Sequence, residues 1–159
     1  MLDAGLMTNE VRCVFNRVLT VNVRTTDGKT VSVDGVFMDS YHELYLNIIV
    51  SMDDFTIVAA NSECRRIPLP DCHHVQEQVK YLVGLKMAKG IRRKIQNTIG
   101  SDYGCTHMVE LAMECVRTLV AAKYSLMRGE MSNAEVMAKV EASSFFKGSC
   151  YHFRTKKEI

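Results

Sequence analysis

The tripeptide Cys105-Thr106-His107 follows Gly104 and opens a segment in which apolar residues recur at helical spacing. A helix start offers free N–H donors and the positive end of the helix dipole, and both favour a thiolate over a thiol. If Cys105 caps the helix and His107 lies in its first turn, both side chains reach the same ion. The spacing therefore predicts a soft-metal or reactive-thiol centre at this helix start.

Three further cysteines stand where turns would expose them: Cys64, Cys72 and Cys150. Histidines accompany two of them, with His73 and His74 beside Cys72 and His152 beside Cys150. Thiolate and imidazole ligands together suit zinc, iron or an iron–sulfur cluster. The chain has no Cys-x-x-Cys pair, so three interpretations stay open: a metal site, unconnected structural cysteines, or a metal-free reactive thiol.

The remaining cysteines and one histidine have simpler interpretations. Cys115 lies on the apolar stripe of its helix and Cys13 lies in an expected strand, so both are expected to be buried. His42 falls in a turn and is expected to be exposed. His73 and His74 are expected on the surface, unless one of them joins the site.

A basic run near residue 90 raises the question of anion binding. Lys86 and Arg93 are the candidates to bind an anionic cofactor or an acidic substrate, and the alternative is a solvated helix face. The sequence contains no Gly-rich phosphate loop, no dinucleotide fingerprint and no Gly-x-Ser-x-Gly elbow.

The overall composition limits the classes of function. The 159 residues, 47% apolar and 24% charged, suit a single domain over residues 1–159. A net charge of +2 gives no support for nucleic-acid binding, and no apolar run approaches the roughly 18–20 residues of a membrane helix. The first residues lack the basic region of a secretory signal, so we expect a cytoplasmic protein whose thiols stay reduced.

The first part of the chain, about 10–66, has the pattern of a β-sheet. Strands are expected over about 11–24, 31–37, 44–50 and 56–64, where apolar and polar residues alternate. Turn residues separate them at Asp27-Gly28, Asp39-Ser40 and Asp53-Asp54. Short turns between four strands predict an antiparallel meander with one buried face.

The second part, about 71–146, has the pattern of helices and is followed by a short tail. Helices are expected from Asp71 to about 83, over about 87–98, from a Thr106 cap, and from Ser132 or Asn133 to about 143. Strands first and helices second predict an α+β domain, with about four helices packed on one face of the sheet.

Several stretches resemble a bacterial family known as domain of unknown function 2889: Cys72, Leu82-Val83-Gly84-Leu85, Gly90-Ile91-Arg92-Arg93 and Gly104-Cys105-Thr106-His107-Met108-Val109-Glu110-Leu111. The resemblance covers roughly residues 10–155, and Gly-Cys-Thr-His is its most specific part. It implies a ligand set of three thiols and one imidazole, Cys72, Cys105, His107 and Cys150. The late Cys-His pair of the family departs here, because Tyr151 separates Cys150 from His152.

The order of strands and helices also resembles that of U-type iron–sulfur scaffold proteins. Those proteins hold one thiol after the last strand and another at the start of a late helix, where this chain has Cys64 or Cys72 and Cys105. Fold analogy alone does not carry function.

These residues are compatible with three alternative functions. The first is a cytoplasmic metal-binding protein that holds zinc, iron or an iron–sulfur cluster, with Cys64 in reserve as a ligand. The second is a small enzyme with Cys105 as nucleophile, or with a bound metal, acting on an acidic small molecule. The third is an accessory subunit that binds a second copy or a protein partner. The sequence alone does not decide whether the protein is an enzyme.

Overall fold

The computed structural model describes residues 12–25, 27–129, 131–142 and 151–154. The chain divides into two compact units, Met1–Val116 and Arg117–Ile159, which are described separately. A single domain over residues 1–159 therefore stays a prediction. No described helix is both long enough and apolar enough to span a membrane.

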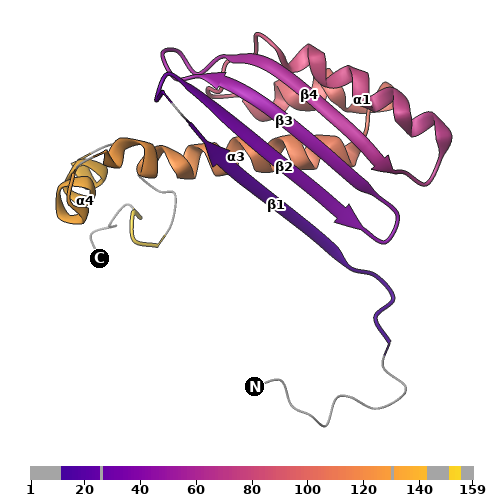
Figure 1. Ribbon diagram of the computed structural model, residues 1–159, viewed down its shortest axis with the longest axis horizontal. Helices are drawn as coiled ribbons and strands as arrows, with labels where there is room; N and C mark the ends of the chain where they lie inside the picture. Colours follow the sequence, from indigo (N-terminus) through magenta and orange to yellow (C-terminus); the bar gives the residue numbers. More distant parts are fainter. Residues whose placement is uncertain (1–11, 26, 130, 143–150, 155–159) are drawn as a thin grey trace. The chain divides into compact units, whose positions relative to one another are not determined.

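The first unit contains the expected four-stranded antiparallel meander, in the order β1-β2-β3-β4 (Figure 1). Its strands are β1 (Arg17–Arg24), β2 (Thr30–Asp39), β3 (Glu43–Ser51) and β4 (Ile57–Arg66). The first strand begins at Arg17 rather than near residue 11, and Cys13 is exposed instead of buried. The α+β fold class predicted from the sequence is confirmed.

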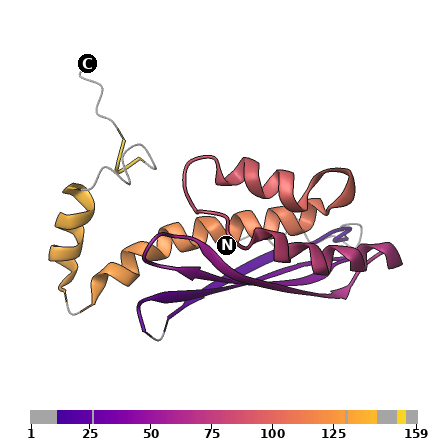
Figure 2. The same ribbon diagram turned by 90° about the horizontal axis from the view of Figure 1, so that it is seen from above.

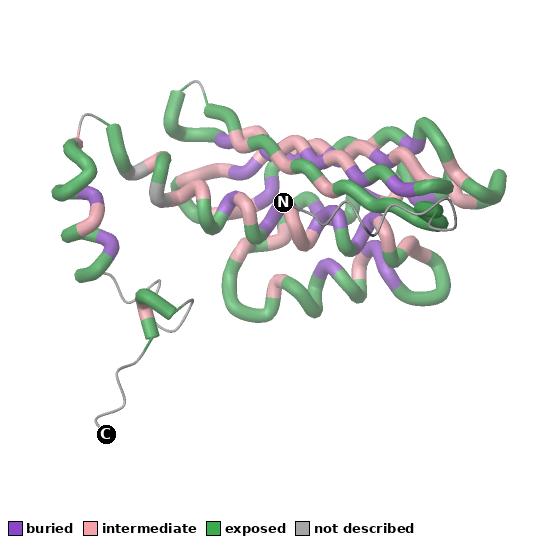
Figure 3. Tube along the Cα trace, turned by 90° about the horizontal axis from the view of Figure 1, so that it is seen from below, coloured by how far each residue is buried: buried purple, intermediate pink, exposed green. Residues whose placement is uncertain are grey.

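Alternation along the strands sorts the side chains onto two faces of the sheet. The inner face of β2 and β3 carries buried residues: Val31, Val33, Gly35, Phe37, Asp39, Leu44, Leu46, Ile48 and Val50. Figure 3 shows this alternation of buried and less buried residues along the strands. Asp39 is the exception within this set, because it is a carboxylate in the last inward-facing position of β2.

Short helices follow the sheet: η2 (Pro70–His73), α1 (His74–Gln78), η3 (Val79–Leu82), α2 (Ile91–Ile99) and η4 (Ser101–Tyr103). The helix expected from Asp71 is thus three short pieces, since Pro70 starts a 3-10 turn one residue earlier. α2 begins later than expected, after Gly90, whose φ of 88° lies in the left-handed region that favours glycine.

The long helix α3 (Thr106–Arg128) begins in the first unit and packs its first half on the inner face of the sheet. A Cβ added to Gly35 would lie 2.7 Å from the Cys115 sulfur and 2.8 Å from Leu111 Cδ1. Glycine therefore lets the helix approach β2 this closely. Figure 2 shows α1, α2 and the first half of α3 on one side of the sheet. Cys115 is fully buried, as expected.

The second unit contains the end of α3 and the helix α4 (Asn133–Ala142). The Ser132 hydroxyl accepts a hydrogen bond from the Glu135 N–H at 3.3 Å, and the Glu135 carboxylate accepts from the Ser132 N–H at 2.8 Å. This reciprocal pair is a capping box, so Ser132 is the cap of α4. The predicted helix start is confirmed.

Candidate metal and thiol site

The start of α3 brings Cys105 and His107 together. The Cys105 carbonyl accepts the Val109 N–H at 3.0 Å, which makes Cys105 the N-cap and places His107 in the first turn. Thr106, expected as the cap, is instead the first helical residue. The Cys105 sulfur lies 3.8 Å from His107 Nδ1. Both side chains therefore face one location, as the spacing predicts.

Gly104 allows the backbone just before this helix to pack closely against the end of α2. A Cβ at this position would lie 2.1 Å from the Ile99 carbonyl oxygen and 2.5 Å from that of Gly100. The Ile99 carbonyl accepts the Cys105 N–H at 3.1 Å, which ties the cap residue to the end of α2. The glycine of Gly-Cys-Thr-His is thus explained by a close backbone approach that positions Cys105.

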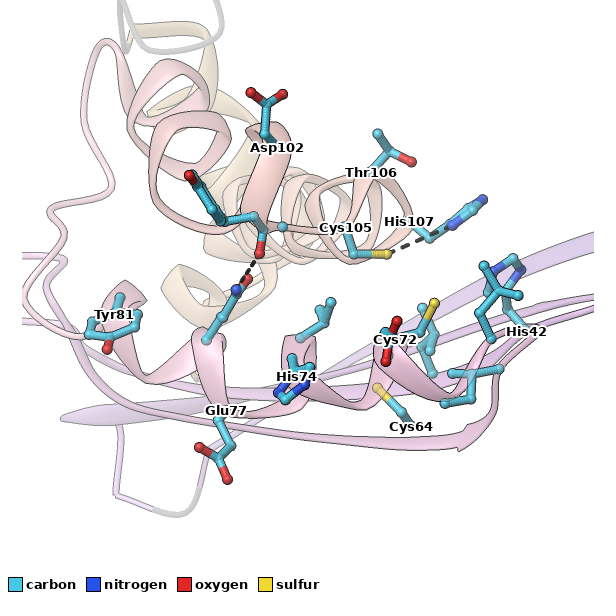
Figure 4. A pocket seen from close by; sticks show the side chains of 18 of the residues that line it. His42, Cys64, Cys72, His74, Glu77, Tyr81, Asp102, Cys105, Thr106 and His107 are labelled. Atoms are coloured by element: carbon cyan, nitrogen blue, oxygen red, sulfur yellow. Dashed lines mark hydrogen bonds between the residues drawn. The ribbon is translucent and has the colours of Figure 1, made fainter.

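A pocket of about 740 Å³ lies between the end of the sheet and the helices. Four chain segments line it with candidate ligands: His42 from the turn before β3, Cys64 from β4, Cys72 from η2, and Cys105 with His107 from the start of α3. Figure 4 shows these side chains at one end of the pocket. Residues far apart in the sequence therefore share one site.

The thiols lie close enough to influence one another. Burial, followed by the nearby thiols of Cys105 and Cys72, raises the pKa of the Cys64 thiol. Cys64 is only 5% exposed, because it faces inward opposite Leu44, so the expectation that a turn exposes it is wrong. Three thiols gathered in this way favour a bound cation, since a cation would stabilise their thiolate forms.

Asp39 and His42 form a buried pair at the end of β2. Asp39 Oδ1 accepts the backbone N–H groups of Tyr41 at 2.8 Å and His42 at 2.7 Å, and it lies 2.9 Å from His42 Nδ1. Burial alone would raise the pKa of the Asp39 carboxyl, but these N–H groups and the His42 ring outweigh it and hold the pKa at about 2. The carboxylate is therefore ionised and positions the His42 ring.

The His42 ring packs against the His107 ring, with the centroids 4.0 Å apart and the ring planes inclined by 38°. Phe37 closes one side, with its ring centroid 5.2 Å from that of His107. Burial, followed by the neighbouring His42, lowers the pKa of His107. His42 is 12% exposed, so the expectation that its turn exposes it is wrong. A neutral His107 has a ring nitrogen lone pair available for a metal.

Arg17 closes the network on the side of β1. Its guanidinium lies 3.1 Å from Glu110 Oε2 and 3.7 Å from Asp39 Oδ2, and it stacks over the Phe37 ring at 4.9 Å. Arg17 stands directly opposite Asp39 in the register of β1 and β2. The second carboxylate oxygen of Asp39 thus faces a positive charge rather than the pocket.

Among the other predicted residues that the structure describes, His74 alone lines the pocket, and it is exposed. Lys86 pairs with Asp54 at 3.4 Å, and Arg93 is exposed on α2; neither lines the pocket. His73 is exposed and does not line the pocket either. Cys150 lies outside the described residues.

One ligand group within the described part of the chain joins His107 to two residues that the sequence did not single out as ligands, Asp39 and His42. Ligand atoms of Asp39, His42 and His107 all lie within 4.8 Å of one another. The sequence signal was weak: an Asp-x-x-His turn whose aspartate continues the inward-facing positions of a strand. That position predicts burial, and a buried carboxylate requires partners.

The family model described as Protein of unknown function (DUF2889) matches residues 11–121, more than half of the chain. This chain belongs to that family. The matched range contains all five pocket ligands named above and Asp39, whereas Cys150 and His152 lie beyond it. Neither the curated proteins nor the solved structures give a match.

Proposed function

We propose that this protein binds a single zinc or iron ion in the pocket at the start of α3, with Cys72, Cys105 and His107 as ligands. The observation that carries the proposal is the convergence of three thiols with the imidazoles of His42 and His107, from four chain segments, on one pocket. Cys64 and Cys150 are the fourth ligands considered from the sequence. Mixed sulfur and nitrogen ligands are typical of tetrahedral zinc and iron sites.

Measurement of metal content tests this proposal. We expect about one zinc or iron per purified chain, and loss of that metal in Cys105→Ser and in His107→Ala. Cys13→Ser is the matched control, because it removes an exposed thiol that does not line the pocket. Unchanged metal content in Cys105→Ser would reject the proposal.

The same ligands could instead hold an iron–sulfur cluster rather than a single ion. It would add visible absorbance and acid-labile sulfide to the iron content, whereas a zinc protein is colourless. The likeness to U-type scaffold proteins stays a prediction, since no solved structure matches the chain.

A second candidate function rests on the contact between Cys105 and His107. A thiol at a helix N-cap, 3.8 Å from an imidazole nitrogen, is the arrangement of an activated nucleophile. If this protein is a thiol enzyme, iodoacetamide labels Cys105 much faster than the exposed Cys13 at neutral pH after chelation of metal. Equal labelling rates for the two thiols count against it.

A further inference from the structure

We propose that His42 is the fourth ligand of this metal site, held in place by Asp39, and that the resulting set of two imidazoles and two thiolates selects a single zinc ion. This inference rests on the proposed metal-binding function. It assigns His42 to the fourth ligand position, for which the sequence suggested Cys64 or Cys150. Asp39 is then a positioning residue that orients the His42 ring.

The first step concerns which His42 nitrogen is free. Asp39 Oδ1 accepts two backbone N–H groups and lies 2.9 Å from His42 Nδ1. A carboxylate only accepts hydrogen bonds, so His42 Nδ1 carries the proton. In the neutral form of the ring, which is the form that binds a metal, the lone pair is then on Nε2. A carboxylate that orients a metal-bound histidine in this way is a recurrent feature of zinc sites.

The second step concerns the rigidity of this arrangement. The carbonyl of His42 accepts the Asp39 N–H at 3.0 Å and a guanidinium N–H of Arg66 at 3.2 Å. Arg66 also donates to the Ser40 carbonyl at 2.8 Å. The turn is therefore tied to β4, and the His42 ring is 12% exposed. A ligand held by so many contacts loses little conformational freedom when it binds.

The third step concerns the distance to His107. A ring nitrogen of His42 and one of His107 lie within 4.8 Å of each other. Two nitrogens bound to tetrahedral zinc at about 2.0–2.1 Å lie about 3.3 Å apart. Binding of zinc would therefore require the two rings to rotate about their side-chain torsion angles until the free nitrogens reach this separation. His107 also contacts the Cys105 sulfur, so His42 joins a pair of ligands already in place.

The alternatives for the fourth position are weaker. Cys64 faces the inner side of the sheet and is 5% exposed, whereas His42 already has a ring nitrogen within 4.8 Å of one of His107. Cys150 lies beyond the range matched by the family. His42 and Asp39 both lie within that range.

The ligand types indicate the metal. Two imidazoles and two thiolates form the tetrahedral set typical of structural zinc, whereas a four-iron cluster is held by four thiolates. A Rieske two-iron cluster uses the same ligand types but binds both thiolates to one iron and both imidazoles to the other. The 3.8 Å between the Cys105 sulfur and His107 Nδ1 instead favours one ion shared by a thiolate and an imidazole. Four protein ligands leave no open position for substrate, so the zinc stabilises the meeting point of β2, η2 and α3.

X-ray absorption spectroscopy of the zinc-loaded wild-type chain tests the assignment directly. We expect two imidazoles and two sulfurs around the zinc. In parallel, zinc affinity is measured against a chromophoric chelator for His42→Ala and Asp39→Asn. We expect Asp39→Asn to lose about 10–100-fold in affinity, the usual effect of removing an orienting carboxylate. The loss in His42→Ala should be larger.

Asp34→Asn is the matched control, because Asp34 lies on the same strand but points to the outer face, towards Arg24 and Asn47. Its zinc affinity should equal that of the wild type. Circular dichroism shows whether each variant folds. The X-ray absorption spectrum of the wild type gives the ligand count even if Asp39→Asn does not fold.

Each result leads to one conclusion. Two imidazoles, together with weaker binding by His42→Ala, support the inference. If the wild type binds zinc through one imidazole and His42→Ala binds equally well, the inference is overturned while the proposed function stands. If the wild type binds neither zinc nor iron, both are overturned.

Discussion

Replacing Asp39 by asparagine should remove a pH-dependent part of the stability of the metal-free protein. The pKa of this carboxyl is about 2 in the folded chain, against a usual value of 3.8. Each pKa unit corresponds to about 1.4 kcal/mol, so ionised Asp39 contributes about 2 kcal/mol to the free energy of unfolding. Its side chain is 1% exposed, so screening by solvent reduces this value little.

The direction of the pH dependence follows from the lowered pKa. The contribution is complete above a pH of about 4 and is lost as the pH falls through about 2, because protonation then favours the unfolded chain. Other carboxylates titrate in the same range, so the quantity of interest is the difference between wild type and Asp39→Asn. That difference should shrink by about 2 kcal/mol between pH 7 and pH 2.

Urea unfolding followed by circular dichroism, in the presence of a chelator, measures this difference at several pH values. Asp53→Asn is the control, since Asp53 is an exposed carboxylate in the turn after β3. Its difference from the wild type should stay constant. If the difference for Asp39→Asn also stays constant from pH 7 to pH 2, the electrostatic account of the Asp39 turn is wrong.

Two further predictions concern local structure. Gly104→Ala should lower the free energy of unfolding by about 2–4 kcal/mol in thermal melting, since the added Cβ would overlap a backbone carbonyl. Gly28→Ala meets no atom within 4 Å and should cost only about 1–2 kcal/mol for its φ of 69°, and equal losses would contradict the steric account. Ser132→Ala should weaken α4 by about 1 kcal/mol, measured by amide hydrogen exchange over Asn133–Ala142. The same change at Ser125, an exposed residue inside α3, should leave that exchange unchanged.

The local elements were predictable because neighbouring residues determine them. Alternation predicted the strands, and the turns at Asp27-Gly28 and Asp39-Ser40 followed from side chains that hydrogen-bond the backbone two or three residues on. The capping box at Ser132 is equally local. The prediction fails for the helix expected from Asp71, where α-helical and 3-10 conformations are nearly equal in energy. There Pro70 and the packing against β4 divide the segment into short pieces.

The candidate site was predictable only in part. Cys105 and His107 are two residues apart, so their proximity follows once a helix begins between them. Cys64 was placed at an exposed turn, but the pairing of Leu44 with Cys64 directs its side chain inward. Whether a strand residue near a turn faces the core depends on the register with its neighbour, and a single sequence does not determine that register.

The sequence by itself determined the α+β order, the turns and the Cys-x-His helix start, because these depend on contacts over a few residues. Only the tertiary structure revealed Asp39 and His42 as part of the site. Their partner His107 lies more than sixty positions along the chain, and it reaches them because Gly35 lets α3 pack closely on the inner face of β2. Contacts between distant segments depend on how surfaces pack, and no local pattern of residues specifies that packing.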